Sequence, residues 1–138
     1  MRSSPVTAGL LLALNAPGVF ACGYCVEDKI ASTYDHAVVT QALAHRHQIA
    51  FFHIDGAVVP GEATKRSLEA TAESTPGVDK GSVRVAVDTS TISFAFDPRR
   101  APLVAVQAAL DKKFAAKKLS LMPLRIIDTV AELKTVKR

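Results

Sequence analysis

The chain has 138 residues, a length that suits one small domain with a modest core. Its 49% hydrophobic and 22% charged residues are typical of a folded protein and exclude a disordered one. The formal charge of +4 is mild, and the basic residues are not interleaved with aromatic side chains, which argues against a nucleic-acid binder.

The first 21 residues have the pattern of an export signal. A short apolar run covers residues 7–14, and Val19 and Ala21 are small residues at the two positions that a signal peptidase reads. The apolar run is too short to cross a bilayer as a helix. We therefore expect cleavage before Cys22 and a mature protein in the periplasm or cell envelope, without an integral membrane span. A lipoprotein with lipid on that cysteine and a buried N-terminal helix are the alternatives.

The only two cysteines, Cys22 and Cys25, form a CxxC pair directly after the predicted signal. Two thiols at this spacing either close a disulfide or bind one soft metal ion. A disulfide across two intervening residues contributes little stability, because the entropic gain grows with loop length. Metal or redox chemistry therefore explains the pair better than a structural bridge does. For a metal, two soft thiolates favour Cu(I) or another soft ion.

One amphipathic helix is predicted from about Val26 to His45, because apolar residues recur there at a spacing of three and four. Glu27 and Asp28 lie in its first turn, where negative charge suits the helix dipole. At ~1.5 Å per residue, His36 lies about 16 Å along this helix from the cysteine pair. We therefore expect that His36 does not share a metal ion with the cysteines.

Three of the four histidines form a weaker, second candidate metal site, namely His45, His47 and His53. His45 and His47 face one side if the chain becomes extended at Arg46. His53 lies on the predicted strand that follows and faces the added helix, where a lone histidine is more often a packed, hydrogen-bonded residue. The Cys-plus-His spacing of a tetrahedral zinc site is absent from the sequence.

The rest of the chain is predicted to contain strand, helix, strand, strand, helix and strand, over residues 47–55, 62–73, 82–88, 91–97, 101–114 and 121–127. The first strand is apolar on both faces, as in a central strand that is covered on two sides. The third and fourth segments form a hairpin, and Pro123 in the last strand indicates an edge position. This order is typical of an α+β, ferredoxin-like βαββαβ sandwich, here with an added N-terminal helix.

Four stretches, residues 75–78, 82–85, 92–98 and 103–112, resemble the heavy-metal-associated domain of copper chaperones and metal-transporting ATPases. The resemblance covers about residues 48–128 and implies the ferredoxin-like fold and the binding of a soft metal ion. That family carries its two metal-binding cysteines in the loop after the first strand. Here that loop, residues 55–61, contains neither Cys nor His, so no ligand is carried over to it.

We accordingly expect four segments, a signal peptide over 1–21, a CxxC-bearing helix over 22–47, a domain like the heavy-metal-associated one over 48–128, and a C-terminal tail over 129–138 with a short helix. The small side chains of Ala86 and Ala95 leave room for the added helix on the sheet face opposite the other two helices.

Two main functions are compatible with these residues. The first is a small exported metal-binding protein of metal homeostasis that passes a soft ion, such as Cu(I), to a partner protein. The second is a thiol–disulfide oxidoreductase in which Cys22 or Cys25 attacks, although nothing before Cys22 reads as the strand that precedes a thioredoxin-type CxxC. A structural or partner-binding envelope protein with an incidental disulfide is the third. We expect a binding protein and not an enzyme, and the sequence leaves its oligomeric state open.

Overall fold

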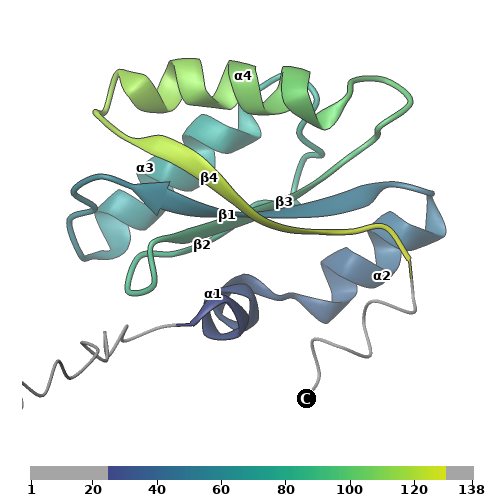
Figure 1. The fold of residues 1–138 in the computed structure, drawn as a ribbon, viewed down its shortest axis with the longest axis horizontal. Coiled ribbons are helices and arrows are strands. Elements are labelled where there is room, and N and C mark those ends of the chain that lie inside the picture. Colours follow the sequence, from purple (N-terminus) through teal and green to yellow (C-terminus); the bar gives the residue numbers. More distant parts are fainter. Residues whose placement is uncertain (1–24, 130–138) are drawn as a thin grey trace, which may run out of the picture.

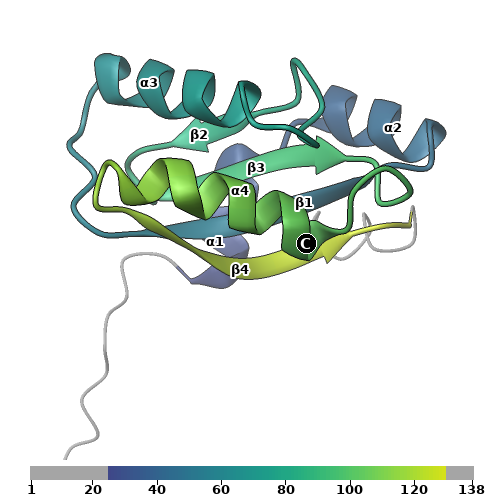
Figure 2. The ribbon, with the colours of Figure 1, turned by 90° about the horizontal axis from the view of Figure 1, so that it is seen from above.

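A four-stranded antiparallel sheet lies between two layers of helices in residues 25–129, the part of the chain that this computed structural model describes (Figure 1). The elements follow in the order α1 (Val26–Thr33), α2 (His36–Ala44), β1 (Gln48–Asp55), α3 (Glu62–Glu73), β2 (Arg84–Ala86), β3 (Thr91–Phe96), α4 (Leu103–Ala115) and β4 (Ser120–Ile127). Helices α1 and α2 cover one face of the sheet, and α3 and α4 cover the other (Figures 1 and 2).

The strand order is β2-β3-β1-β4, with every neighbouring pair antiparallel. Together with the order of the elements from β1 onward, this arrangement is the ferredoxin-like βαββαβ fold that the sequence predicts. Strand β1 is central, as its two apolar faces indicate, and β4 with Pro123 lies at an edge. The hairpin of β2 and β3 is confirmed, although β2 is only three residues long.

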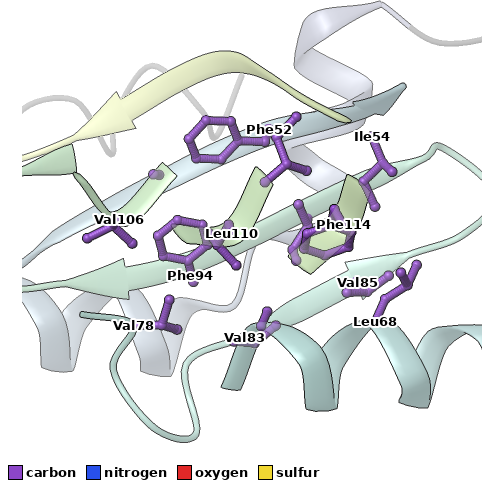
Figure 3. Packing of buried hydrophobic residues seen from close by; sticks show 14 of the residues in the cluster. Phe52, Ile54, Leu68, Val78, Val83, Val85, Phe94, Val106, Leu110 and Phe114 are labelled. Atoms are coloured by element: carbon purple, nitrogen blue, oxygen red, sulfur yellow. The ribbon is translucent and has the colours of Figure 1, made fainter. Parts of the chain in front are cut away.

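The larger hydrophobic core lies between the sheet and helices α3 and α4 (Figure 3). Phe52 of β1 stacks on Phe94 of β3 with ring centroids 5.7 Å apart, and Phe94 meets Phe96 edge to face at 6.3 Å. Helix α4 places Leu110 and Phe114 against these rings, and both side chains are fully buried. Phe52, Phe94 and Phe96 lie on the same face of the sheet, because successive side chains along a strand point to opposite faces.

A smaller core lies on the other face, beneath α1 and α2. Ile30 of α1 and Val39 of α2 are buried there against Ile49 and Phe51 of β1. Ala95 also belongs to this cluster, which confirms that a small side chain leaves room for a helix on this face. The N-terminal helical layer is thus packed on the same sheet as the rest of the domain.

The prediction of one continuous helix from Val26 to His45 is wrong, because the chain breaks at Tyr34 and Asp35 into α1 and α2. The Asp35 carboxylate accepts hydrogen bonds from the backbone N–H groups of Ala37 (3.0 Å) and Val38 (3.3 Å), which caps α2. Aspartate competes with the helix for backbone donors, so it favours a new helix start over helix continuation.

The same carboxylate also accepts a hydrogen bond from Nε of Arg84 at 3.0 Å, and this ion pair ties the break to strand β2. Hydrogen bonds to this carboxylate hold the pKa of Asp35 below its usual value. The bond from the backbone N–H of Val38 has the largest effect, and the bond from Arg84 comes next. The kink is therefore fixed by the sheet beneath it.

Several predictions concern residues that lie outside the described range, namely the signal peptide over 1–21, Cys22 and all but the first residue of the predicted tail over 129–138. Among residues 25–129, no helix is long and apolar enough to span a membrane.

Candidate metal site

Cys25 lies at the N-cap position of α1, and its side chain is exposed as a free thiol. The Asp28 carboxylate, one turn into the helix, accepts hydrogen bonds from the Cys25 backbone N–H (3.4 Å) and from the Cys25 thiol (3.2 Å between Sγ and Oδ2). The thiol therefore points toward a carboxylate. Its partner in the CxxC pair, Cys22, precedes the described residues.

Helix α1 crosses the sheet from the edge strand β4 toward β2, and its start lies on the β4 side (Figure 2). Glu27 in the first turn forms a two-pronged ion pair with Arg125 of β4, with 3.1 Å between Oε2 and Nη1. This pairing lowers the pKa of Glu27, chiefly through the hydrogen bond from Arg125. At the other end of the helix, the Ser93 hydroxyl of β3 donates to the Thr33 carbonyl at 3.2 Å. The exposed thiol thus lies at an edge of the sheet.

Lys29 reaches under α1 to the sheet. Its ammonium group donates to Nδ1 of His53 at 3.1 Å and to the Thr89 carbonyl at 2.8 Å. An ammonium group only donates, so Nδ1 of His53 accepts this hydrogen bond and its lone pair is occupied by Lys29. The prediction that His53 faces the added helix is confirmed. Because the Lys29 ammonium group already contacts this ring nitrogen, the contact does not favour a metal ion bound to the same nitrogen.

His45 and His47 lie close together, with ring centroids 6.1 Å apart, because Arg46 between them adopts a left-handed turn with φ 61°. They line a hollow of about 310 Å³ between α2 and the loop that follows α3. His45 donates from Nδ1 to the Gln41 carbonyl (2.8 Å), which leaves Nε2 available.

Both ring nitrogens of His47 face carboxylates. Nδ1 bonds to Asp79, and Nε2 lies 3.6 Å from Oδ2 of Asp97. Asp97 is also bound by the guanidinium of Arg99 (3.0 Å), and that hydrogen bond is the main reason why the pKa of Asp97 lies below its usual range. His47 therefore joins the start of β1 to Asp79 and Asp97 as part of an ionic cluster.

The structure brings His45 and His47 together but not His53. Six residues of strand at about 3.3 Å each separate His53 from His47, so the two lie about 20 Å apart. His36 lies on the outside of α2 and contacts the Tyr34 hydroxyl at 3.3 Å. Between residues 25 and 129, no group of three or more His, Cys, Asp or Glu side chains is arranged to hold a metal ion.

The contact of Asp28 with Cys25 was not predicted, because Asp28 was expected only to suit the positive end of the helix dipole. Its position three residues after the N-cap residue is the spacing of a capping box, in which the side chain at N3 bonds back to the N-cap backbone. That spacing is visible in the sequence and predicts that the carboxylate lies beside the Cys25 thiol.

The chain matches no protein-family profile and no curated protein sequence. Similar solved structures include a copper-binding domain of HMA7, a P-type ATPase (18% identity, TM-score 0.45, 57% of this chain and 96% of the other). Oxidised MerP from Ralstonia metallidurans CH34 has the same identity and TM-score. That match covers 57% of this chain and 99% of the MerP chain.

The N-terminal domain of a potential copper-translocating P-type ATPase from Bacillus subtilis, in the Cu(I)-loaded state, is 20% identical with a TM-score of 0.44, over 61% of this chain and 95% of the other. By its own topology, the chain is a ferredoxin-like α+β domain with an added layer of two helices on the open face of the sheet.

Proposed function

We propose that this protein binds one soft metal ion, such as Cu(I), through the thiolates of Cys22 and Cys25. The observation that carries the proposal is the exposed, free thiol of Cys25 at the start of α1, with two residues between it and the only other cysteine of the sequence. Thiolates are the ligands that soft ions prefer, and two of them suffice for Cu(I).

The surroundings of the histidines support the thiols as ligands. The lone pair of His53 is taken by Lys29, and His47 is held between Asp79 and Asp97. A metal ion at either ring would first have to break these interactions. The loop over residues 55–61 contains no Cys or His, so it offers no soft ligand either.

The exposure of Cys25 favours transfer of the ion over its storage. An ion at an exposed helix start, held by few ligands, is accessible to the thiols of another protein. We therefore propose a role in metal homeostasis in which the bound ion passes to a partner protein. The His45 and His47 pair remains a proposed second, weaker site, because His45 keeps Nε2 available.

We also propose that the protein is exported and that its mature N-terminus lies at or next to Cys22, without lipid. The short apolar run and the small residues at positions 19 and 21 support cleavage at this point. The intact mass of the protein isolated from the cell envelope tests this proposal. A mass that retains residues 1–21 contradicts export, and an added acyl mass supports the lipoprotein alternative.

A Cu(I) competition titration of the reduced protein tests the ligands. Cys25→Ser is expected to abolish stoichiometric binding, whereas the matched control His36→Ala on the same helical layer retains it. If a Cys22→Ser/Cys25→Ser double variant binds Cu(I) as tightly as the parent, the thiols are not the site. If the parent binds no metal but its thiols exchange readily with a small disulfide, the protein is a thiol–disulfide oxidoreductase.

A further inference from the structure

Another hollow lies where the loop after β1 meets the first turns of α3 and the turn between α4 and β4, at one end of the molecule (Figures 1 and 2). Its volume of about 390 Å³ is within the range of small-molecule sites in proteins. Leu68 and Leu119 in its wall belong to the core beneath α3 and α4. The sheet therefore separates this hollow from Cys25 on α1.

The wall of the hollow is mostly apolar and is formed by six aliphatic side chains, namely Ala57, Val58, Val59, Ala63, Leu68 and Leu119. Val59 is 66% exposed, and none of the other exposed large hydrophobic side chains in the described range lines this hollow. The apolar surface at this place is thus small and concave. It fits a single aliphatic chain, whereas a stable interface with another protein needs a much larger area.

A single cationic side chain is among the residues that line the hollow. The ammonium group of Lys117 donates to Oγ of Ser67 at 3.0 Å, and this bond holds it against α3. None of the lining residues is acidic, and Lys117 forms no ion pair within residues 25–129. Two other hollows differ in this respect, because Asp79 lines both of them.

The charges that precede and follow Lys117 in the chain have the same sign. Residues 111–118 contain four lysines and one carboxylate, that of Asp111. This carboxylate is already engaged, since it accepts a hydrogen bond from the backbone N–H of Leu121 at 3.0 Å. The end of α4 and the turn that follows it therefore carry an excess of positive charge beside an apolar wall, which complements an anion with an apolar part.

We propose that this hollow binds a small amphipathic anion, a carboxylic acid with an aliphatic chain of medium length. The chain lies against Val58, Val59 and Leu119, and the carboxylate accepts a hydrogen bond from Lys117. An ammonium group has several N–H donors, so Lys117 binds the carboxylate while it still donates to Ser67. Each methylene group that leaves water on binding strengthens the affinity by up to about fourfold.

The amide chemical shifts of the ¹⁵N-labelled full chain, followed as octanoate is added, test this proposal. Octanoate should shift the amides around the hollow, in residues 57–68 and 117–119, and leave those of α1 and α2 unchanged. Hexanoate has two fewer methylene groups and should bind about tenfold more weakly. Octanol has the same chain length without the charge and should bind about three- to fivefold more weakly.

Two variants separate the charge from the apolar wall. Lys117→Met keeps an unbranched side chain and removes the charge, so it should weaken octanoate by about three- to fivefold and leave octanol unchanged. Lys112→Met is the matched control, because Lys112 is exposed on α4 and does not line the hollow. Ala63→Leu occupies part of the hollow from an exposed position on α3 and should weaken both ligands by about tenfold. Ala70→Leu, exposed on the same helix outside the hollow, should weaken neither.

The proposal is overturned if octanoate shifts no amides around the hollow below its micelle concentration, or if its shifts are spread over both faces of the sheet. It is also overturned if octanol binds as tightly as octanoate, or if Lys117→Met weakens the two ligands equally. Shifts that arise only above the micelle concentration would assign this surface to lipid aggregates and would contradict a site for single molecules. A circular dichroism spectrum equal to that of the parent shows that each variant is folded.

Discussion

The two faces of the sheet are covered by different kinds of contact. Beneath α3 and α4, stacked aromatic rings and aliphatic side chains form one continuous apolar core. Beneath α1 and α2, the apolar cluster is smaller and is joined by polar contacts that cross from helix to sheet. These contacts include Lys29 to His53 and Thr89, Ser32 to Thr89, Ser93 to Thr33, Arg84 to Asp35 and Arg125 to Glu27.

This difference predicts unequal stability for the two layers of helices. Apolar burial is the main stabilising contribution in folding, so the α3 and α4 face holds the sheet together. The α1 and α2 face carries the thiol, and segments with fewer buried apolar contacts open at a lower free energy than the core. We expect the N-terminal layer to detach from the sheet before the domain unfolds.

The largest effect is expected at the aromatic core. Phe94→Ala removes a fully buried ring that contacts both Phe52 and Phe96, and it should lower the free energy of unfolding by about 3–5 kcal/mol. Urea denaturation followed by circular dichroism measures this loss, which should affect all helices and strands in one transition.

A smaller and more local effect is expected at the other face. Ile30→Ala truncates the side chain that anchors α1, and it should cost about 2–3 kcal/mol. Hydrogen exchange should show faster exchange of the amides of α1 and α2, with the amides of β1 and β3 unchanged. Ile30→Val is the matched control, with a cost of about 1 kcal/mol. Equal acceleration over the whole domain would contradict an independently opening layer.

The break between α1 and α2 gives a prediction that depends on pH. Asp35→Ala removes the cap of α2 and its ion pair with Arg84, with an expected cost of about 1 kcal/mol near neutral pH. The pKa of Asp35 is lowered in the folded protein from an ordinary value of 3.8. Its charge therefore stabilises the fold above about pH 4, and this contribution is lost as the pH falls through the lowered pKa.

Asp35→Asn keeps the cap and removes the charge, so it separates the two effects. The urea midpoint of the parent should fall toward that of Asp35→Asn as the pH is lowered from 6 to 3. Parallel curves for the two proteins over this range would show that the charge of Asp35 makes no contribution.

The smallest effect is expected at Thr33, whose buried hydroxyl has no hydrogen-bond partner in the described structure. Thr33→Val keeps the shape and removes a buried polar group that is not satisfied, so it should stabilise the protein by up to about 1 kcal/mol. Thermal unfolding measures the change. A loss of stability would mean that the hydroxyl is satisfied in solution, for instance by water.

Much of the fold follows from local patterns in the sequence. The bounds of α3 agree with the prediction, because a Pro-Gly pair precedes it and a Pro-Gly turn follows it. The central place of β1 was predicted because the strand is apolar on both faces, and small side chains indicated where an added helix packs. The break at Asp35 was missed because the apolar spacing continues through it. The cap that Asp35 forms with Ala37 and Val38 is local, whereas its ion pair with Arg84 comes from a distant strand.

The site was only partly predictable for a similar reason. The CxxC pair is a local motif, and so is the capping spacing that brings Asp28 to Cys25. The surroundings of the histidines are not local. Nδ1 of His53 on β1 accepts a hydrogen bond from Lys29 of α1. The ring of His47 lies between Asp79 and Asp97, which come from two other segments of the chain. These contacts join distant parts of the chain, and spacing alone does not indicate them.

The most direct test of the account is a thiol titration of the reduced mature protein, with and without metal, combined with metal analysis. A site formed by Cys22 and Cys25 should give two reactive thiols in the metal-free protein, one bound ion per chain after metal addition, and protection of both thiols by that ion. Thiols that remain fully reactive while a metal ion is bound would contradict the central claim, because the ion would then be held elsewhere.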